Sequence, residues 1–142
     1  MNNITPYEEF LKRDLKFGLA EEDRLIHLFR EKFDKLLCKT GDFSVMDFIS
    51  PKTYLELKSR NVKHDTYNSV MIGANKIKFA RDCGKRVIFV FNFTDGIYYY
   101  EFKYEDTRNG VIDFRLGGRM DRGIDERKTY AYININNIVK LE

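Results

Sequence analysis

The fold is decided by residues 86–93, which read RVIFVFNF. Val87 to Phe91 are apolar without alternation, a pattern typical of a strand that is covered on both faces inside a sheet. Asp95-Gly96 follows as a hairpin turn signal. Residues 97–103 then predict a strand that pairs back in the antiparallel direction. The middle of the chain is therefore expected to form a hairpin whose first strand is central in the sheet.

Helices are predicted on both sides of the short segment that precedes this hairpin. Residues 6–16 suit a short helix, which Gly18 interrupts. Residues 20–37 predict a longer amphipathic helix, because their apolar residues recur at spacings of three and four. Another helix is expected over residues 65–83, where Gly84 would occupy the position after the C-cap.

Two strands at 43–49 and 53–59 are expected between these helices, joined by a tight Ser50-Pro51-Lys52 link. The order α-β-β-α-β-β predicts the α/β class, with a mixed central sheet flanked by helices and a right-handed crossover. We expect one domain over 1–142, with a core at about 18–103 and a C-terminal β extension over 104–142. The extension has two further candidate strands, 111–116 and 129–135, and a loop rich in glycine and arginine between them.

Composition excludes several classes of protein. The 142 residues are 43% hydrophobic and 33% charged, so a globular core is expected and disorder is not. The net charge of +3 permits a nucleic-acid partner without requiring one. No apolar run is long enough to span a membrane, and the N-terminus lacks the form of a signal peptide. An intracellular location, cytoplasmic or nucleoid-associated, is therefore expected. Two cysteines and two histidines are too few for a disulfide framework, a zinc site or a His-based metal site, so any metal would be bound by oxygen.

The residues that predict chemistry are Asp47 on one strand and Glu56 and Lys58 on the next. If the strands pair, these three side chains can meet on one face of the sheet. Two carboxylates there suit Mg²⁺, and a lysine beside them can orient a water molecule next to a phosphate. The pattern indicates metal-assisted hydrolysis of a phosphodiester bond.

The acid-x-lysine spacing alone is weak evidence, because the chain repeats it. Glu101-Phe102-Lys103 also lies on an expected strand and follows Asp95 after a short gap. Asp95 belongs to a turn, however, whereas Asp47 lies within an expected strand. A crossover helix follows Lys58, and nothing similar follows Lys103. We therefore favour the Glu56 copy.

Residues 18–103 resemble the PD-(D/E)xK nuclease superfamily, and within it the small resolvase-like endonucleases. The resemblance is carried by residues 18–22, which open a helix, by residues 46–49, by residues 54–59, and by the following helix with Lys76. Met46 stands where the family name has proline, and Lys76 stands where some members have glutamine. The fold implied by the resemblance is a restriction-endonuclease-like core.

The resemblance also implies residue roles. Asp47, Glu56 and the backbone carbonyl of Leu57 would bind Mg²⁺, for which Mn²⁺ would substitute, and Lys58 would be the catalytic lysine. Glu22 would be the acid contributed by the first helix. We prefer it to Glu21 because Ile26, Phe29 and Phe33 continue on its side of the helix.

The implied function is a Mg²⁺-dependent endonuclease that hydrolyses DNA. Selectivity for DNA structure, as in the resolvases, is one option, while duplex, single-stranded and RNA substrates stay open. DNA repair and recombination are compatible with the resemblance, and so are restriction and viral DNA processing. Phosphate contacts are expected from five basic residues: Lys76, Arg60, Lys63, Arg119 and Arg122. A homodimer is compatible with so small a domain. Two alternatives stay open: a non-cleaving nucleic-acid-binding module of the same fold, and an interaction protein in which these charges are only surface groups.

Overall fold

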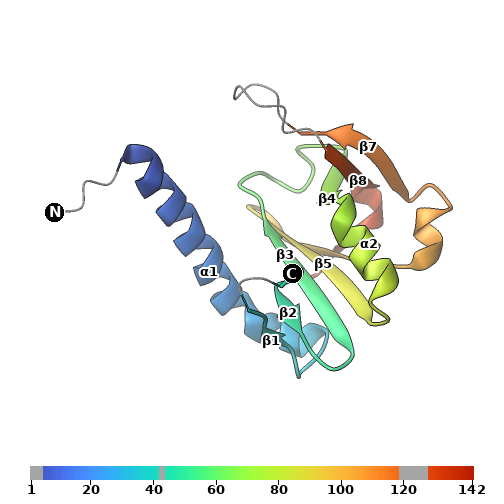
Figure 1. Cartoon of the computed structure of the whole chain (residues 1–142), viewed down its shortest axis with the longest axis horizontal. Coiled ribbons are helices and arrows are strands. Elements are labelled where there is room, and N and C mark those ends of the chain that lie inside the picture. The colour runs from blue at the N-terminus through green and yellow to red at the C-terminus, as the bar shows by residue number, and fades with distance from the viewer. Residues whose placement is uncertain (1–4, 42–43, 119–127) are drawn as a thin grey trace.

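A computed structural model describes residues 5–41, 44–118 and 128–142. It contains a six-stranded mixed sheet in the order β1-β2-β3-β5-β6-β9 and a three-stranded sheet in the order β4-β8-β7. Helix α1 lies on one side of the large sheet, and α2 lies with the small sheet on the other (Figure 1). The elements are α1 (Pro6–Lys32), β1 (Cys38–Lys39), β2 (Phe48–Ile49), β3 (Thr53–Ser59), β4 (Ser69–Gly73), α2 (Ala74–Asp82), β5 (Arg86–Phe93), β6 (Gly96–Glu101), η1 (Tyr104–Thr107), β7 (Ile112–Gly117), β8 (Lys128–Asn134), η2 (Ile135–Asn137) and β9 (Val139–Lys140).

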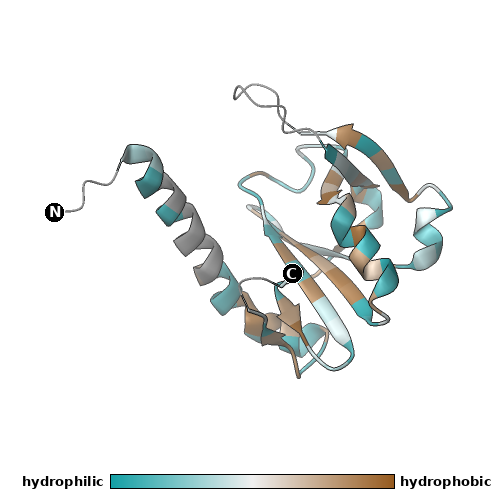
Figure 2. Cartoon of the chain, viewed as in Figure 1, coloured by the Kyte–Doolittle hydropathy of each residue, from teal (hydrophilic) through white to brown (hydrophobic). Residues whose placement is uncertain are grey.

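The central strand is β5, as its sequence predicts. It pairs with β3 in parallel and with β6 in the antiparallel direction, so the mixed character of the sheet is confirmed. Ile88 and Val90 face the α1 side, whereas Val87, Phe89 and Phe91 face the small sheet and α2. All five side chains are buried. Figure 2 shows the corresponding hydrophobic bands along the central strands.

The N-terminal helix is one continuous element, so the predicted interruption at Gly18 is wrong. A capping box fixes its start: Glu8 N–H donates to the Thr5 side chain, and Thr5 N–H donates to the Glu8 carboxylate. A glycine in a helix interior costs only about 1 kcal/mol, which the other turns of this 27-residue helix offset. The helix ends at Lys32 rather than at residue 37.

The segment predicted as a helix over 65–83 is a strand followed by a shorter helix. Val70 and Ile72 are buried and the residues between and beside them are half-buried, so the segment alternates with period two before α2 begins at Ala74. β4 pairs with β8 and thereby builds the small sheet. The pattern of residues 67–80 fits helical spacing as well, and only the tertiary partner decides in favour of a strand.

Within the described part of the strand predicted over 43–49, only the two residues of β2 form a strand, and residues 45–47 form bends instead. β3 has the predicted bounds. The predicted strands of the extension appear as β7 and β8, within a residue of their expected limits. Of the glycine- and arginine-rich loop, residues 119–127 lie outside the described part. No helix in the described ranges is both long enough and apolar enough to cross a membrane.

Candidate active site

Asp47 immediately precedes β2 and lies beside β3. Its backbone N–H donates to the Leu55 carbonyl, and its Oδ2 accepts from the Leu57 N–H at 2.8 Å. The side chain of Asp47 therefore takes the place of the next backbone partner along β3. Because backbone groups two residues apart in a strand point the same way, the Leu57 carbonyl faces the same edge as Asp47.

Glu56 points to the opposite face of β3 from Leu55 and Leu57, whose side chains pack toward α1. The Glu56 residue is only 6% exposed. Its Oε2 lies 2.7 Å from the Lys76 ammonium. The two groups form a buried ion pair.

Burial raises the pKa of Glu56 to about 7, and the neighbouring Asp47 carboxylate adds to the rise, while Lys76 opposes it. The pKa of Glu22 is also raised, by burial and by Asp47. Asp47 thus interacts with two other acids, Glu22 on α1 and Glu56 on β3. Carboxylates that disfavour one another's charge attract a cation.

Lys58 follows Glu56 on the same face of β3 and is half-buried. Burial lowers the pKa of its ammonium; Glu56 and Asp47 favour the charged form, while Arg60 and Lys76 oppose it. A lysine with a lowered pKa, held beside carboxylates, is suited to orient a water molecule and to accept a proton.

Glu22, the predicted α1 acid, and Glu21 have different neighbours. Glu22 interacts with Asp47 and lies 3.8 Å from the Lys39 ammonium. Glu21 instead accepts from Arg24 at 2.8 Å and also contacts Asn92 on β5. Glu22 is therefore the α1 acid that lies next to the Asp47 carboxylate.

The residues present fit a hard divalent cation. Asp47, Glu56 and the Leu57 carbonyl supply oxygen donors of the type that Mg²⁺ and Mn²⁺ prefer. The buried Glu56 Oε2 already lies 2.7 Å from the Lys76 ammonium, so a metal ion bound there would take the place of that ammonium. Lys76 is the competing cation at this position.

A different trio has the tightest spacing of acid and histidine groups in the described ranges. Ligand atoms of His64, Asp65 and Asp95 all lie within 4.8 Å of one another. The Glu22, Asp47 and Glu56 side chains do not meet as closely. His64 Nδ1 is 2.6 Å from Asp95 Oδ2, and the pair joins the loop after β3 to the β5–β6 turn. Because Asp95 is engaged there and Glu101 pairs with Arg86 at 2.7 Å, the second acid-x-lysine copy does not form a cluster of its own.

The expected phosphate-binding residues fall into three groups. Lys76 lies in the first turn of α2, where it contacts Glu56 and donates to the Val45 carbonyl. Arg60 and Lys63 line a pocket beyond the end of β3. Arg119 and Arg122 lie outside the described residues. Lys76 thus lies beside Glu56, and Arg60 lies near Lys58, whose pKa both basic residues lower.

Sequence reasoning missed the apolar part of that pocket, which includes Val70, Met71 and Tyr132. The residues of β4 were expected on a helix, where they would not line a surface together with β8. The sequence of residues 69–73 has no signal that separates the strand from a helix, because the pairing of β4 with β8 decides it.

Comparison with known proteins gives one family. A family model described as "Phage putative PDDEXK endonuclease" matches residues 22–140. No curated protein and no solved structure gives a significant match. The matched segment includes every candidate residue from Glu22 to Arg122 and reaches through both sheets. It extends the resemblance, first read over 18–103, into the C-terminal strands. The chain therefore belongs to this phage PDDEXK endonuclease family, and with it to the PD-(D/E)xK nuclease superfamily.

Proposed function

We propose that this protein is a Mg²⁺-dependent endonuclease that hydrolyses phosphodiester bonds in DNA. The observation that carries the proposal is the juxtaposition of Asp47 with the buried Glu56 at the edge of β3, with Lys58 two residues further along the same strand. Membership of an endonuclease family supports the reaction class.

In this proposal Asp47, Glu56 and the Leu57 carbonyl hold the cation. When bound, Mg²⁺ supplies Lewis-acid stabilisation of the charge that develops on the phosphate. The Leu57 N–H donates to Asp47 Oδ2 and fixes the carboxylate, so Asp47 Oδ1 is available for the cation without a further loss of side-chain freedom.

The other charged groups have separate parts in the reaction. Lys58 orients the attacking water and takes up its proton, to which its lowered pKa is suited. The water oxygen bonds to phosphorus as the bond to the leaving sugar oxygen breaks, and the leaving oxygen takes a proton from solvent. Lys76, which contacts Glu56, would be available to bind a phosphate oxygen of the DNA if a cation took its place. Glu22, which lies next to Asp47, would add negative charge for a cation held there.

One observation favours a second candidate, the non-cleaving nucleic-acid-binding module. The Lys76 ammonium lies 2.7 Å from the Glu56 carboxylate and balances its charge. A protein of this fold that binds no metal would need such a cation beside the buried carboxylate. The two candidates differ in their response to divalent cations. Selectivity for DNA structure, substitution by Mn²⁺, a homodimer, and a role in repair or recombination are further parts of the proposal.

Nicking of supercoiled plasmid DNA tests the function. We expect conversion to nicked and linear forms with Mg²⁺ or Mn²⁺ and none with EDTA. Asp47→Asn and Glu56→Gln should each remove cleavage by about 100-fold or more, since each removes a charged ligand of the cation. Glu101→Gln is the matched control, because it changes the same motif position in the second copy. Equal nicking by Asp47→Asn and the unmodified protein would refute the assignment.

A further inference from the structure

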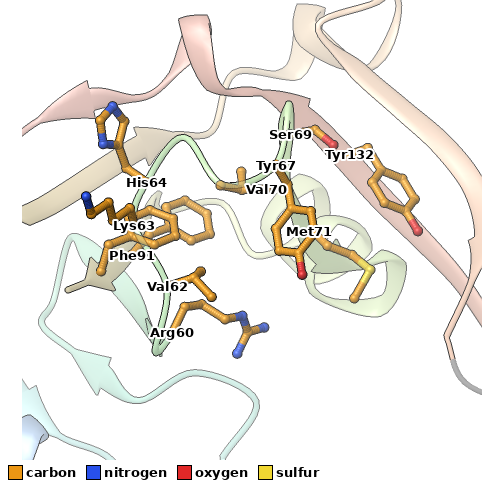
Figure 3. A pocket seen from close by; sticks show the side chains of 11 residues that line it. Arg60, Val62, Lys63, His64, Tyr67, Ser69, Val70, Met71, Phe91 and Tyr132 are labelled. Atoms are coloured by element: carbon orange, nitrogen blue, oxygen red, sulfur yellow. The ribbon is translucent and has the colours of Figure 1, made fainter. Parts of the chain in front are cut away.

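A pocket of about 400 Å³ opens beyond the C-terminal end of β3 (Figure 3). Its walls come from residues 60–69, β4, β5 and β8. Val70, Met71, Phe91 and Phe93 make part of the lining apolar. The volume lies within the range of about 300–1,000 Å³ that is usual for small organic ligands, so a single planar base fits.

The pocket combines three kinds of group that recognise a nucleotide. Tyr67, 68% exposed, presents an aromatic face at the rim. Arg60 and Lys63 add fixed positive charge suited to phosphate. An apolar floor, an exposed aromatic ring and a basic rim are the combination that binds unpaired bases of a polyanionic strand.

The histidine at the rim is held in one orientation. Its backbone N–H donates to Asp95 Oδ1 at 2.9 Å, and its ring nitrogen contacts Asp95 Oδ2 at 2.6 Å. The ring also stacks on Tyr98, with centroids 4.5 Å apart and planes inclined by 13°. His64 thus contacts both carboxylate oxygens of Asp95. Asp65, the second acid of this cluster, is exposed. The segment that carries Arg60 and Tyr67 is thus attached to the β5–β6 turn.

The pocket and the candidate active site share the strand and loop that carry Lys58 and Arg60. Arg60 lies two residues after Lys58, and its charge lowers the pKa of Lys58. Met71 is on β4, which leads directly into α2 and Lys76. A strand whose phosphate lies beside Glu56 and Lys58 would therefore present a neighbouring nucleotide to this pocket.

We propose that the pocket binds one unstacked nucleobase of the DNA strand that is cut. The inference rests on the proposed function and adds a substrate class to it: DNA with an unpaired nucleotide next to the scissile phosphate. An unpaired base enters most readily, because a base already out of the duplex has little stacking and pairing to lose. Tyr67 stacks on the base, and Arg60 binds the adjoining phosphate.

The test measures binding without cleavage, with the full chain carrying Asp47→Asn, in EDTA. Two fluorescent single-stranded oligonucleotides of equal length are compared, one of deoxyadenosine and one of abasic nucleotides. In this background Tyr67→Ala should weaken binding of the first about tenfold and leave the second unchanged, because only the first has a base to stack. Arg60→Ala should weaken both. Tyr7→Ala is the matched control, since Tyr7 is also 68% exposed but lies on α1.

Three results overturn the inference. In the first, Tyr67→Ala changes the binding of neither oligonucleotide. In the second, Tyr67→Ala weakens the binding of both equally. In the third, free deoxyadenosine monophosphate binds as tightly as the deoxyadenosine oligonucleotide. The last result would assign the pocket to a free nucleotide. Because binding is measured without metal, a failure of plasmid nicking leaves these outcomes unaffected, and a failure here leaves the nicking assay unaffected.

Discussion

Replacing Glu56 by glutamine should stabilise the metal-free protein at high pH. The carboxyl group keeps its proton more tightly in the folded chain than in the unfolded chain, because its pKa is raised from 4.5 to about 7. The unfolded chain releases this proton above pH 4.5, whereas the folded chain holds it up to about pH 7. The free energy of unfolding therefore falls as the pH rises through this interval and stays lower above it.

The size of the effect follows from the same two values. The interval from 4.5 to about 7, at about 1.4 kcal/mol per pH unit, corresponds to about 3 kcal/mol. Only 8% of the Glu56 side chain is exposed, so solvent screens little of this cost. Glutamine keeps the shape and removes the charge. Lys76 retains the Val45 carbonyl as an acceptor in the variant.

Urea unfolding at pH 5 and pH 8 in EDTA measures this difference. We expect Glu56→Gln to match the unmodified protein within about 1 kcal/mol at pH 5 and to exceed it by about 2–3 kcal/mol at pH 8. Glu31→Gln, an exposed change on α1, serves as the control and should show no such dependence. Parallel profiles for Glu56→Gln and the unmodified protein would refute the reasoning that Glu56 is a buried, destabilised carboxylate.

Three further outcomes test separate parts of the structure. Lys58→Met should lower plasmid nicking by about 100-fold or more with an unchanged circular dichroism spectrum, because it removes the group that positions water; retained nicking would exclude that role. Gly84→Ala should lower the free energy of unfolding by about 1 kcal/mol, because Gly84 has a φ of 71°, which strains any residue with a Cβ. The added methyl group meets no other atom within 4 Å, so backbone strain is the whole effect. An unchanged urea midpoint would contradict this. Tyr100→Phe should lower the free energy of unfolding by about 1–3 kcal/mol, because the Tyr100 hydroxyl donates at 2.5 Å to the buried Asp106, which loses this donor in the variant. Calorimetry measures the loss, and an unchanged melting temperature would contradict it.

The sequence predicts the centre of this fold well because its signals are local. An unbroken apolar run is enough to place β5 between two covering layers, and Asp95-Gly96 is enough to begin the return strand. β3 is also correct, since Leu55 and Leu57 alternate with Glu56 and Lys58. Of the candidate site, β3 contains Glu56, Leu57 and Lys58.

The errors arise where a distant partner decides the structure. Residues 69–73 become a strand because β8, some sixty residues later, offers them a sheet edge. Asp47 lies next to β3 without belonging to a strand, since its side chain replaces a backbone partner for Leu57. Neither the pocket beyond β3 nor the His64–Asp95 contact has a local signal, because both depend on the loop after β3 meeting the β5–β6 turn.

The most direct test of the central claim is anomalous diffraction from crystals of the protein soaked in Mn²⁺. If Asp47 and Glu56 share one divalent cation, the strongest peak will lie about 2.0–2.6 Å from an oxygen of each and from the Leu57 carbonyl, with Lys76 displaced from Glu56. The same peak should be missing in Asp47→Asn crystals. A peak at His64, Asp65 and Asp95 alone, or none beside Glu56, would contradict the account.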